Sequence, residues 1–211
     1  MHPLSPDLLA ILSQPAPLVA PMLIGWTLTR HSPDGPVTVE LTEVEAYAGP
    51  ADPASHAWRG ETARNAVMFG PAGRLYVYLS HGLHWCANVV TGPEGEASGV
   101  LLRAGRVVEG VDLAQRRRGE RVAVRSLARG PGCLGQVLAL TREHGGSNLL
   151  DGEPFTLRPP AGPVGPVASG PRVGVSRAHD WPWRYWLSGD PTVSAYRRGR
   201  LADSQGESGL V

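Results

Sequence analysis

Two stretches of the chain alternate between apolar and polar residues, which is the pattern of a half-buried β-strand. Residues 26–30 alternate in this way, and residues 37–47 begin with valine or leucine at every second position. The segment Ser32-Pro33-Asp34-Gly35 between them is typical of a turn. The pattern predicts a strand–turn–strand unit with Glu45 near the end of its second strand.

Further elements follow from apolar spacing and from turn residues. Strands are expected at residues 75–80, 84–90, 99–106, 154–157, 172–175 and 184–187. Helices are expected at residues 6–12, 17–23, 108–118 and 133–141, the first of them capped by Ser5. This order favours an α+β fold, a single domain with a mixed, mainly antiparallel curved sheet surrounded by helices and long loops. We expect the domain to span residues 1–202 and a flexible C-terminal tail to follow at 203–211.

Two long segments, 48–73 and 144–170, are rich in glycine and proline. A loop as long as 48–73 inside a compact domain is usually either functional or disordered. Aromatic and imidazole side chains gather in and beside it, although only 6% of the whole chain is aromatic. We therefore expect an ordered, functional loop there, with one helical turn near Arg64, and a surface loop at 144–170.

The composition limits the chemistry that the chain can perform. All 20 basic residues are arginine, so the fold offers no lysine amine for a Schiff base. The two cysteines, Cys86 and Cys133, do not make a disulfide framework in a chain of 211 residues. The longest apolar run, at 18–26, contains Pro21 and is too short to span a bilayer. The expected location is the cytoplasm, without a membrane partner.

Charge is distributed unevenly, although the formal net charge is only +1. Residues 103–130 carry eight arginines against three acids, and residues 172–200 carry six arginines against two acids. Residues 34–62, by contrast, carry six acids and one arginine. Two basic stretches on a nearly neutral protein indicate a polyanionic partner. A solvated helix face explains the run from Arg116 to Arg118 equally well.

Glu45 is the main candidate for catalysis. It shares strand parity with Leu41, so an unbroken strand would turn it toward the apolar face, although Glu43 has the same parity. Tyr47 lies two residues further and shares the face of Glu45. A carboxylate beside an aromatic ring is an arrangement suited to a general base. The alternative is a solvated glutamate at the end of a strand.

The aromatic and imidazole residues allow two further interpretations. Tyr47 and Tyr78, from two strands, could form the walls of a slot for a planar ligand, which would stack on them. Ordinary core packing is the alternative, above all for Tyr76. A metal site could use the side chains of His56, His81, His84 and Cys86. A zinc site needs three or four converging ligands, however, and an offset of three along a strand turns His81 and His84 to opposite faces.

Nine short motifs follow one another between about residues 15 and 195. The first six are Glu45-Ala46-Tyr47, Ser55-His56, Arg64-Asn65-Ala66-Val67-Met68-Phe69, Leu75-Tyr76-Val77-Tyr78, Asn88-Val89-Val90 and Leu101-Leu102-Arg103-Ala104. The later three are Gly130-Pro131-Gly132, Arg172-Val173-Gly174-Val175 and Val193-Ser194. Each motif is weak alone, but their order and spacing together resemble the alkyladenine (3-methyladenine) DNA glycosylase family.

The resemblance implies hydrolysis of the N-glycosidic bond of damaged purines in duplex DNA, after extrusion of the target nucleotide. The catalytic residues it implies are Glu45, which would activate a water, and Arg103 and the Val173 carbonyl, which would help to hold that water. The base-pocket residues it implies are Tyr47, His56, Tyr78 and Asn88. The DNA-binding residues it implies are Thr62, Arg64, Met68, His81 and Gly174. No metal ion and no cofactor is expected.

The same resemblance implies a substrate range and a mode of DNA binding. The slot would take alkylated or deaminated purines, because stacking does not read base edges and a methylated cationic ring gains a cation–π term. Asn88 would crowd the exocyclic amine of normal guanine. A monomer would contact damaged double-stranded DNA through the minor groove. With no lysine in the fold, the enzyme would use water, cut no strand, and act at the bacterial nucleoid.

The chain departs from the family at two positions. His81 stands where the family typically has a tyrosine that fills the gap left by the extruded base, and Cys133 stands where many members have a lysine facing DNA. The loop after His56 is one residue shorter than in some relatives, which bears on the roles of Thr62 and Arg64.

Two other functions are compatible with the residues alone. A metal-dependent hydrolase built on the histidines and Glu45 predicts loss of activity with a chelator. A non-catalytic nucleic-acid-binding module predicts salt-dependent binding without base release. The carboxylate beside Tyr47 disfavours the second alternative, because a pure binder needs no buried acid at the centre of a basic footprint.

Overall fold

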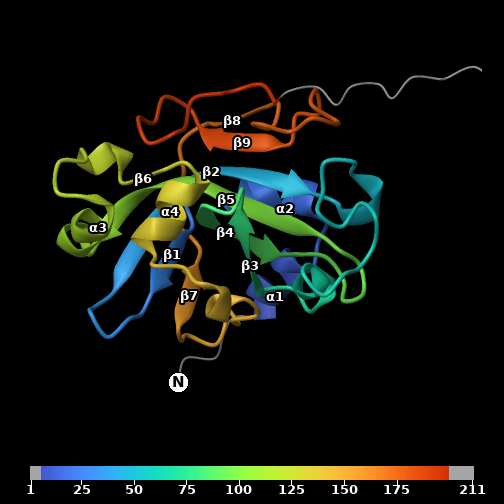
Figure 1. The fold of residues 1–211 in the computed structure, drawn as a ribbon, viewed down its shortest axis with the longest axis horizontal. Helices are drawn as coiled ribbons and strands as arrows, with labels where there is room; N and C mark the ends of the chain where they lie inside the picture. Colours follow the sequence, from blue (N-terminus) through green and yellow to red (C-terminus); the bar gives the residue numbers. More distant parts are fainter. Residues whose placement is uncertain (1–5, 200–211) are drawn as a thin grey trace, which may run out of the picture.

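The computed structural model describes residues 6–199, which form an α+β fold around one large sheet (Figure 1). The helices are α1 (Pro6–Leu12), α2 (Ala16–Met22), α3 (Val111–Arg118) and α4 (Pro131–Val137). The strands are β1 (Thr27–Arg30), β2 (Val37–Tyr47), β3 (Leu75–Ser80), β4 (His84–Val90), β5 (Gly99–Glu109), β6 (Ala128–Arg129), β7 (Phe155–Arg158), β8 (Val167–Gly170) and β9 (Arg184–Leu187). Short 3₁₀ segments are η1 (Gly49–Ala51), η2 (Ala66–Phe69), η3 (Val124–Ser126) and η4 (Arg142–His144). The tail predicted at 203–211 and the Ser5 cap lie outside the described residues.

The sheet has the main order β3-β4-β5-β2-β1-β7, and every pair of neighbouring strands is antiparallel. Strand β2 lies at its centre. One edge of β2 pairs with β5, while its other edge pairs with β1 in its first half and with β9 in its second half. The segment between Glu43 and Glu45 is therefore flanked by β5 and β9, which bring Arg103 and Arg184 beside it.

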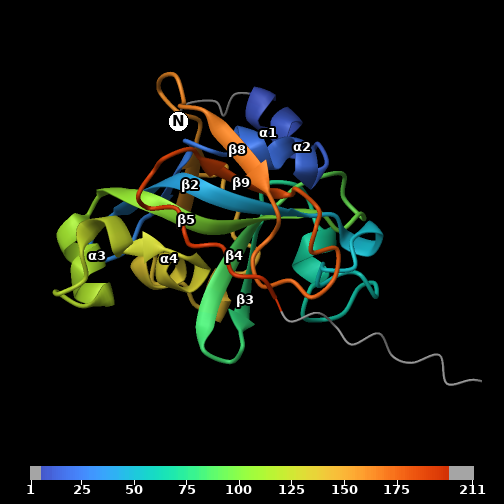
Figure 2. The same ribbon diagram turned by 90° about the horizontal axis from the view of Figure 1, so that it is seen from above.

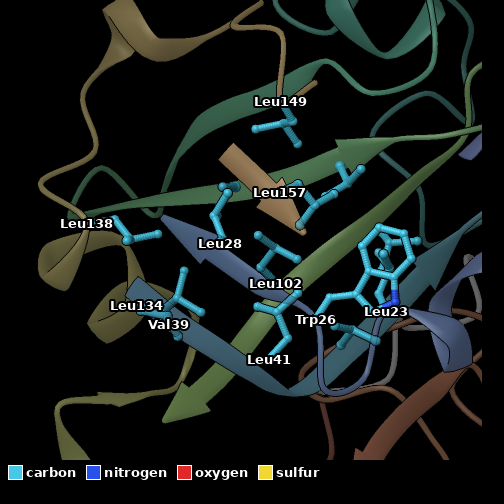
Figure 3. Close-up of a cluster of buried hydrophobic side chains, with 14 of the residues drawn as sticks. Leu23, Trp26, Leu28, Val39, Leu41, Leu102, Leu134, Leu138, Leu149 and Leu157 are labelled. Atoms are coloured by element: carbon cyan, nitrogen blue, oxygen red, sulfur yellow. The ribbon is translucent and has the colours of Figure 1, made fainter. Parts of the chain in front are cut away.

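The core lies on one face of this sheet. Leu28 of β1, Leu41 of β2 and Leu102 of β5 are fully buried and lie close together in Figure 3. Leu134 of α4 and Leu138 just after it pack against the same cluster. Burial of this many aliphatic side chains supplies the main driving force for folding. The opposite face of the central strands carries polar side chains, among them Glu43 and Glu45.

Irregular pairing in β2 decides which face carries Glu45. The register of β2 against β5 shifts between Leu41 and Glu43 and again between Glu43 and Val44. A bulge adds a residue to one strand and reverses the alternation beyond it. Leu41 and Val44 consequently both face the core, and Glu45 faces the other side. The expectation that Glu45 shares the apolar face of Leu41 is wrong, because it assumed an unbroken strand.

Three other expectations need correction. The third helix begins at Val111 rather than 108, because β5 continues to Glu109 and the left-handed Gly110 starts the helix. Residues 172–175 form no strand; a strand instead lies at 167–170, within the predicted surface loop, and pairs with β9. The fourth helix covers Pro131–Val137 rather than 133–141, and the left-handed Ala139 follows it.

Helix α4 packs directly on the hairpin of β3 and β4. A Cβ atom on Gly135 would collide with the backbone oxygen of Trp85, and one on Gly132 would collide with the ring of His84. The absence of side chains at these two positions lets the helix approach β4 closely. The hairpin beyond this contact projects from the sheet, as the view in Figure 2 shows.

No helix among residues 6–199 is both long and apolar enough to cross a membrane.

Candidate active site

A pocket of about 390 Å³ opens beside the exposed side of β2, β3, β4 and β5. Nine of the residues singled out in the sequence line it: Tyr47, His56, Met68, Tyr78, His81, Asn88, Arg103, Val173 and Gly174. They come from the central strands, from the loop after β2, from the β3–β4 turn and from the segment after β8. Segments more than a hundred residues apart in sequence therefore meet in one concave site of a size typical for small-ligand recognition.

Glu45 lies against this pocket and is fully buried. Its Oε1 accepts a hydrogen bond from the backbone N–H of Val173 at 2.7 Å and lies 3.3 Å from Nη1 of Arg103. Its Oε2 accepts a hydrogen bond from the hydroxyl of Tyr47 at 2.9 Å. Two hydrogen bonds and one ion pair thus orient the carboxylate of Glu45, and all three partners line the pocket.

A second buried glutamate, Glu43, holds the arginines in place. Arg103 donates from Nε to Glu43 at 2.8 Å, and Arg184 donates from Nε to the same oxygen at 2.7 Å. The N–H and hydroxyl of Ser194 donate to Glu43 at 2.6 and 2.9 Å. Burial alone would raise the pKa of Glu43, but the charges of the two arginines outweigh it and hold that pKa below its ordinary value.

An ion pair behind the pocket anchors Val173. Arg172 is buried and donates to both carboxylate oxygens of Asp52, at 2.5 and 2.8 Å, and to the carbonyl of Ala46 at 2.9 Å. Its guanidinium also lies 4.7 Å from the ring centre of Tyr47, with Trp181 and Trp183 at 5.8 and 5.3 Å. Arg172 thereby fixes the backbone of the next residue, Val173, whose N–H reaches Glu45.

The rings of Tyr47, His56, Tyr76 and Tyr78 line the pocket. Tyr78 stacks on Tyr76 with ring centres 5.6 Å apart, and His56 meets Tyr78 edge-on at 4.5 Å. Burial and then the charge of Glu45 raise the pKa of Tyr47 well above its ordinary value, and burial raises the pKa of Tyr78 as well. Desolvation and then the charge of Arg64 lower the pKa of His56. At neutral pH the walls are therefore two neutral phenols and a neutral imidazole.

Asn88 and Cys86 of β4 contribute to the pocket wall. Asn88 is buried, and its Nδ2 has no hydrogen-bond partner among the described residues. An unpaired buried amide is costly, so this group is a candidate to meet a ligand. Burial raises the pKa of the Cys86 thiol to about 11, which keeps the thiol protonated and makes it a poor nucleophile.

The loop that carries His56 is organised by Asn65. The amide of this buried side chain donates to the carbonyls of His56 and Gly60, and its oxygen accepts from the backbone N–H of Thr62. Thr62 and Arg64 lie outside the pocket and are exposed. The loop is thus ordered, as expected, and it contains two 3₁₀ segments, η1 at Gly49–Ala51 and η2 at Ala66–Phe69, where one helical turn near Arg64 is expected.

The residues expected to contact DNA occupy different depths. His81 is exposed at the turn between β3 and β4, in a left-handed backbone conformation with φ of 50°, and its Nδ1 lies 3.0 Å from the hydroxyl of Ser80. Gly174 is exposed with φ of 73°. Met68 is only 2% exposed and packs beside Tyr76, so any DNA contact of Met68 has to come through the pocket.

Comparison with known proteins decides the family. The model of the methylpurine-DNA glycosylase family matches residues 10–191, which is most of the chain. The chain belongs to this family. Family membership makes it a DNA N-glycosylase, a hydrolase of DNA repair that binds damaged DNA.

Several bacterial relatives are similar over nearly their whole length. A protein of Frankia casuarinae is 50% identical over 207 residues, which cover 93% of this chain and 95% of that protein. Proteins of Streptomyces avermitilis and Cutibacterium acnes are 51% and 52% identical over 186 and 192 residues, covering 85% and 88% of this chain and 86% and 98% of theirs. Each of the three is provisionally named as a 3-methyladenine DNA glycosylase.

Several residues that build the candidate site are not identified by the sequence interpretation. Glu43 was noticed only for its parity, and Asp52, Arg172 and Arg184 were not singled out individually. Their ion pairs join positions 60 to 141 residues apart, so no local spacing indicates them. One local signal exists, since Arg172 directly precedes Val173 in the motif Arg172-Val173-Gly174-Val175.

Proposed function

We propose that the protein extrudes alkylated or deaminated purines from duplex DNA and hydrolyses their N-glycosidic bond with a water activated by Glu45. The substrates would be 3-methyladenine, 7-methylguanine, hypoxanthine and ethenoadenine. The observation that carries the proposal is the buried Glu45 carboxylate, oriented by two hydrogen bonds and one ion pair beside a slot of aromatic rings.

The reaction needs one water and one base. The water oxygen bonds to C1′ of the deoxyribose while the bond from C1′ to the purine nitrogen breaks, and the purine leaves with that electron pair. Glu45 takes the proton from the water, which leaves a hydroxyl on C1′. Arg103 lies 3.3 Å from Glu45 and lines the pocket, and its charge would hold the carboxylate and a phosphate of the extruded nucleotide. The Val173 carbonyl would be the further contact of the water.

The slot favours damaged purines for two reasons. A purine methylated on its ring carries a positive charge, which the faces of Tyr47 and Tyr78 stabilise and which also makes it a good leaving group. A neutral purine such as hypoxanthine needs a hydrogen bond or a proton on the leaving base, and His56, which lines the pocket, would provide such a contact. The unpaired amide donor of Asn88 would oppose the exocyclic amine donor of normal guanine, in addition to crowding it.

The position of the pocket mouth supports a proposed mode of DNA binding. The projecting β3–β4 hairpin would enter the minor groove, with His81 filling the gap left by the extruded nucleotide. Thr62, Arg64 and Gly174 would contact the backbone around it. A monomer acting in the cytoplasm at the nucleoid would suffice, because all proposed contacts come from one chain.

Hydrolysis without strand cleavage agrees with the chemistry of the chain. Glycosylases that also cut the strand use an amine nucleophile, and this fold contains no lysine. Cys86, the thiol in the pocket, stays protonated because burial raises its pKa. Water is therefore the nucleophile that the pocket supports.

The experiment is base release from a duplex that carries one hypoxanthine or one methylated purine, with EDTA present. We expect release and an intact strand that breaks only after alkali treatment. Loss of release with EDTA would point to a metal-dependent hydrolase instead. Tight, salt-dependent binding without release of any damaged purine would point to a non-catalytic binding module.

A further inference from the structure

A second depression of about 290 Å³ lies beside the pocket mouth, and two arginines line it. It is lined by Pro53, Ser55, His56, Trp58, Arg59, Ser176 and Arg177. Pro53 and His56 also line the main pocket, so the two hollows adjoin. The depression lies between the loop after β2 and the segment before β9, and these two segments lie side by side in Figures 1 and 2.

Both arginines stack on one tryptophan. The guanidinium of Arg177 lies 4.5 Å from the centre of a Trp58 ring, and that of Arg59 lies 5.7 Å from it. Both distances are within the range of a cation–π interaction. A guanidinium that stacks flat on a ring keeps its in-plane N–H groups free to donate.

The donors of these two arginines are unused by the protein. Both side chains are exposed, and within residues 6–199 neither makes an ion pair or a hydrogen bond to another protein group. Glu61 and Asp180, the acids nearest to them in sequence, do not pair with them. The other arginines close to the site behave differently, since Arg103, Arg172 and Arg184 are buried and bound to carboxylates. Two like charges held side by side without a counterion indicate a site for an anion.

We propose that Arg59 and Arg177, stacked on Trp58, bind one backbone phosphate of the DNA strand whose base enters the pocket. This inference rests on the proposed function and extends it. A phosphodiester presents two anionic oxygens, which match the in-plane donors of a guanidinium. The exposed hydroxyl of Ser176 adds a further donor at the rim. A phosphate held there would keep the backbone next to the extruded nucleotide close to the pocket mouth.

The test measures the affinity for a hypoxanthine-containing duplex at several salt concentrations. Neutralisation of one phosphate changes the slope of log K against log salt by about 0.9. We expect the double variant of Arg59→Gln and Arg177→Gln to make the slope shallower by nearly this amount, and each single variant to change it less, because the remaining arginine still neutralises the shared phosphate. Arg158→Gln is the matched control: this exposed arginine lies on β7, on the far side of β1 from β2, and should leave the slope unchanged.

We call Arg59, Arg177 and Trp58 the phosphate clamp. Two further variants test whether the planar, stacked guanidinium binds the phosphate or whether a positive charge alone is enough. Arg177→Lys keeps the charge but not the planar fork, so we expect an unchanged slope and an affinity lower by roughly tenfold. Trp58→Leu keeps apolar bulk but removes the ring, and it should weaken binding while all charges are kept. Full affinity in both variants would overturn the clamp.

Base release by the same protein preparations distinguishes a failure of the phosphate clamp from a failure of the proposed function. If the parent releases hypoxanthine and the double variant keeps the parental salt slope, the phosphate clamp is wrong while the glycosylase proposal stands. If the parent neither releases damaged bases nor binds the duplex, the proposed function is wrong and the clamp falls with it. A slope reduced in the arginine variants and kept in Arg158→Gln supports the clamp.

Discussion

Glu43 and Glu45 lie two residues apart on β2 and are both fully buried, yet their neighbours give them different tasks. Glu43 accepts from Arg103, Arg184 and Ser194, so its oxygens are occupied by protein groups. Glu45 accepts from Val173 and Tyr47 beside the open pocket, with Arg103 only in ionic contact. Glu43 is therefore a positioning residue for Arg103, and Glu45 is the candidate base.

Tyr78 allows a test of the slot at the residue scale. Tyr78→Ala removes a ring that lines the pocket, and we expect it to weaken binding to a damaged site by about 1–3 kcal/mol, the usual value of one base–aromatic stack. The measurement compares affinities for hypoxanthine-containing and undamaged duplexes. Tyr78→Phe keeps the ring and should bind nearly as well as the parent. An unchanged preference for the damaged duplex in Tyr78→Ala would make Tyr78 a core residue only.

At the scale of elements, the β3–β4 hairpin and strand β2 carry the site. The hairpin is held by α4, whose glycines allow close contact with Trp85 and His84, and its turn presents His81. The bulged strand β2 turns two glutamates away from the core without exposing them. Bulges are often found beside active sites because they re-aim side chains in this way.

His81 permits a test of the hairpin. We expect His81→Ala to lower the rate of base release and the stability of the extruded state, because a methyl group cannot fill the gap left in the duplex. His81→Tyr should preserve or improve both. The measurement is fluorescence of a base analogue placed next to the lesion, together with single-turnover release. Parental behaviour of His81→Ala would place the wedge at another residue.

Sequence and structure agree best where elements are regular. Strands at 75–80, 84–90 and 184–187 are predicted with their observed bounds, because each is a short apolar or aromatic run between turn residues. The bulge in β2 is not predictable, since an alternating pattern looks unbroken until a partner strand defines the register. Pocket residues were predicted through family motifs, whereas the ion pairs behind them depend on long-range contacts that a linear pattern does not contain.

At the scale of the whole molecule, the C-terminal segment closes the site over β2. Arg172 is paired with Asp52, Arg184 with Glu43, and Ser194 with Glu43, so three points of one segment are bound to the region that carries the catalytic candidate. Breaking a buried pair by removing one partner costs about 3–5 kcal/mol, because the remaining charge stays buried. Formation of the pocket and folding of this segment are therefore coupled.

The pH dependence of stability tests this coupling. The pKa of Glu43 is lower in the folded protein than the ordinary value of 4.5, so its ionised form stabilises the fold above that value and the contribution is lost as pH falls through the folded pKa. Glu43→Gln should lower the free energy of unfolding by about 3 kcal/mol near pH 7. The difference from the parent should shrink below pH 4.5.

Urea denaturation near pH 7 and below pH 4.5 measures the difference in the free energy of unfolding between Glu43→Gln and the parent. Glu94→Gln is the control, because Glu94 is exposed in a turn and makes no ion pair within the described part of the chain. A destabilisation by Glu43→Gln that is equally large at both acidities would contradict the role assigned to the ionised carboxylate.

The most direct test of the account is the single-turnover rate of hypoxanthine release by the parent and by Glu45→Gln, with both proteins saturated with the same duplex. Loss of the general base should slow release by about 10²–10⁴-fold or more, while binding to the damaged duplex stays near that of the parent. Release by Glu45→Gln at the parental rate, from duplex that is fully bound, would remove Glu45 from the mechanism.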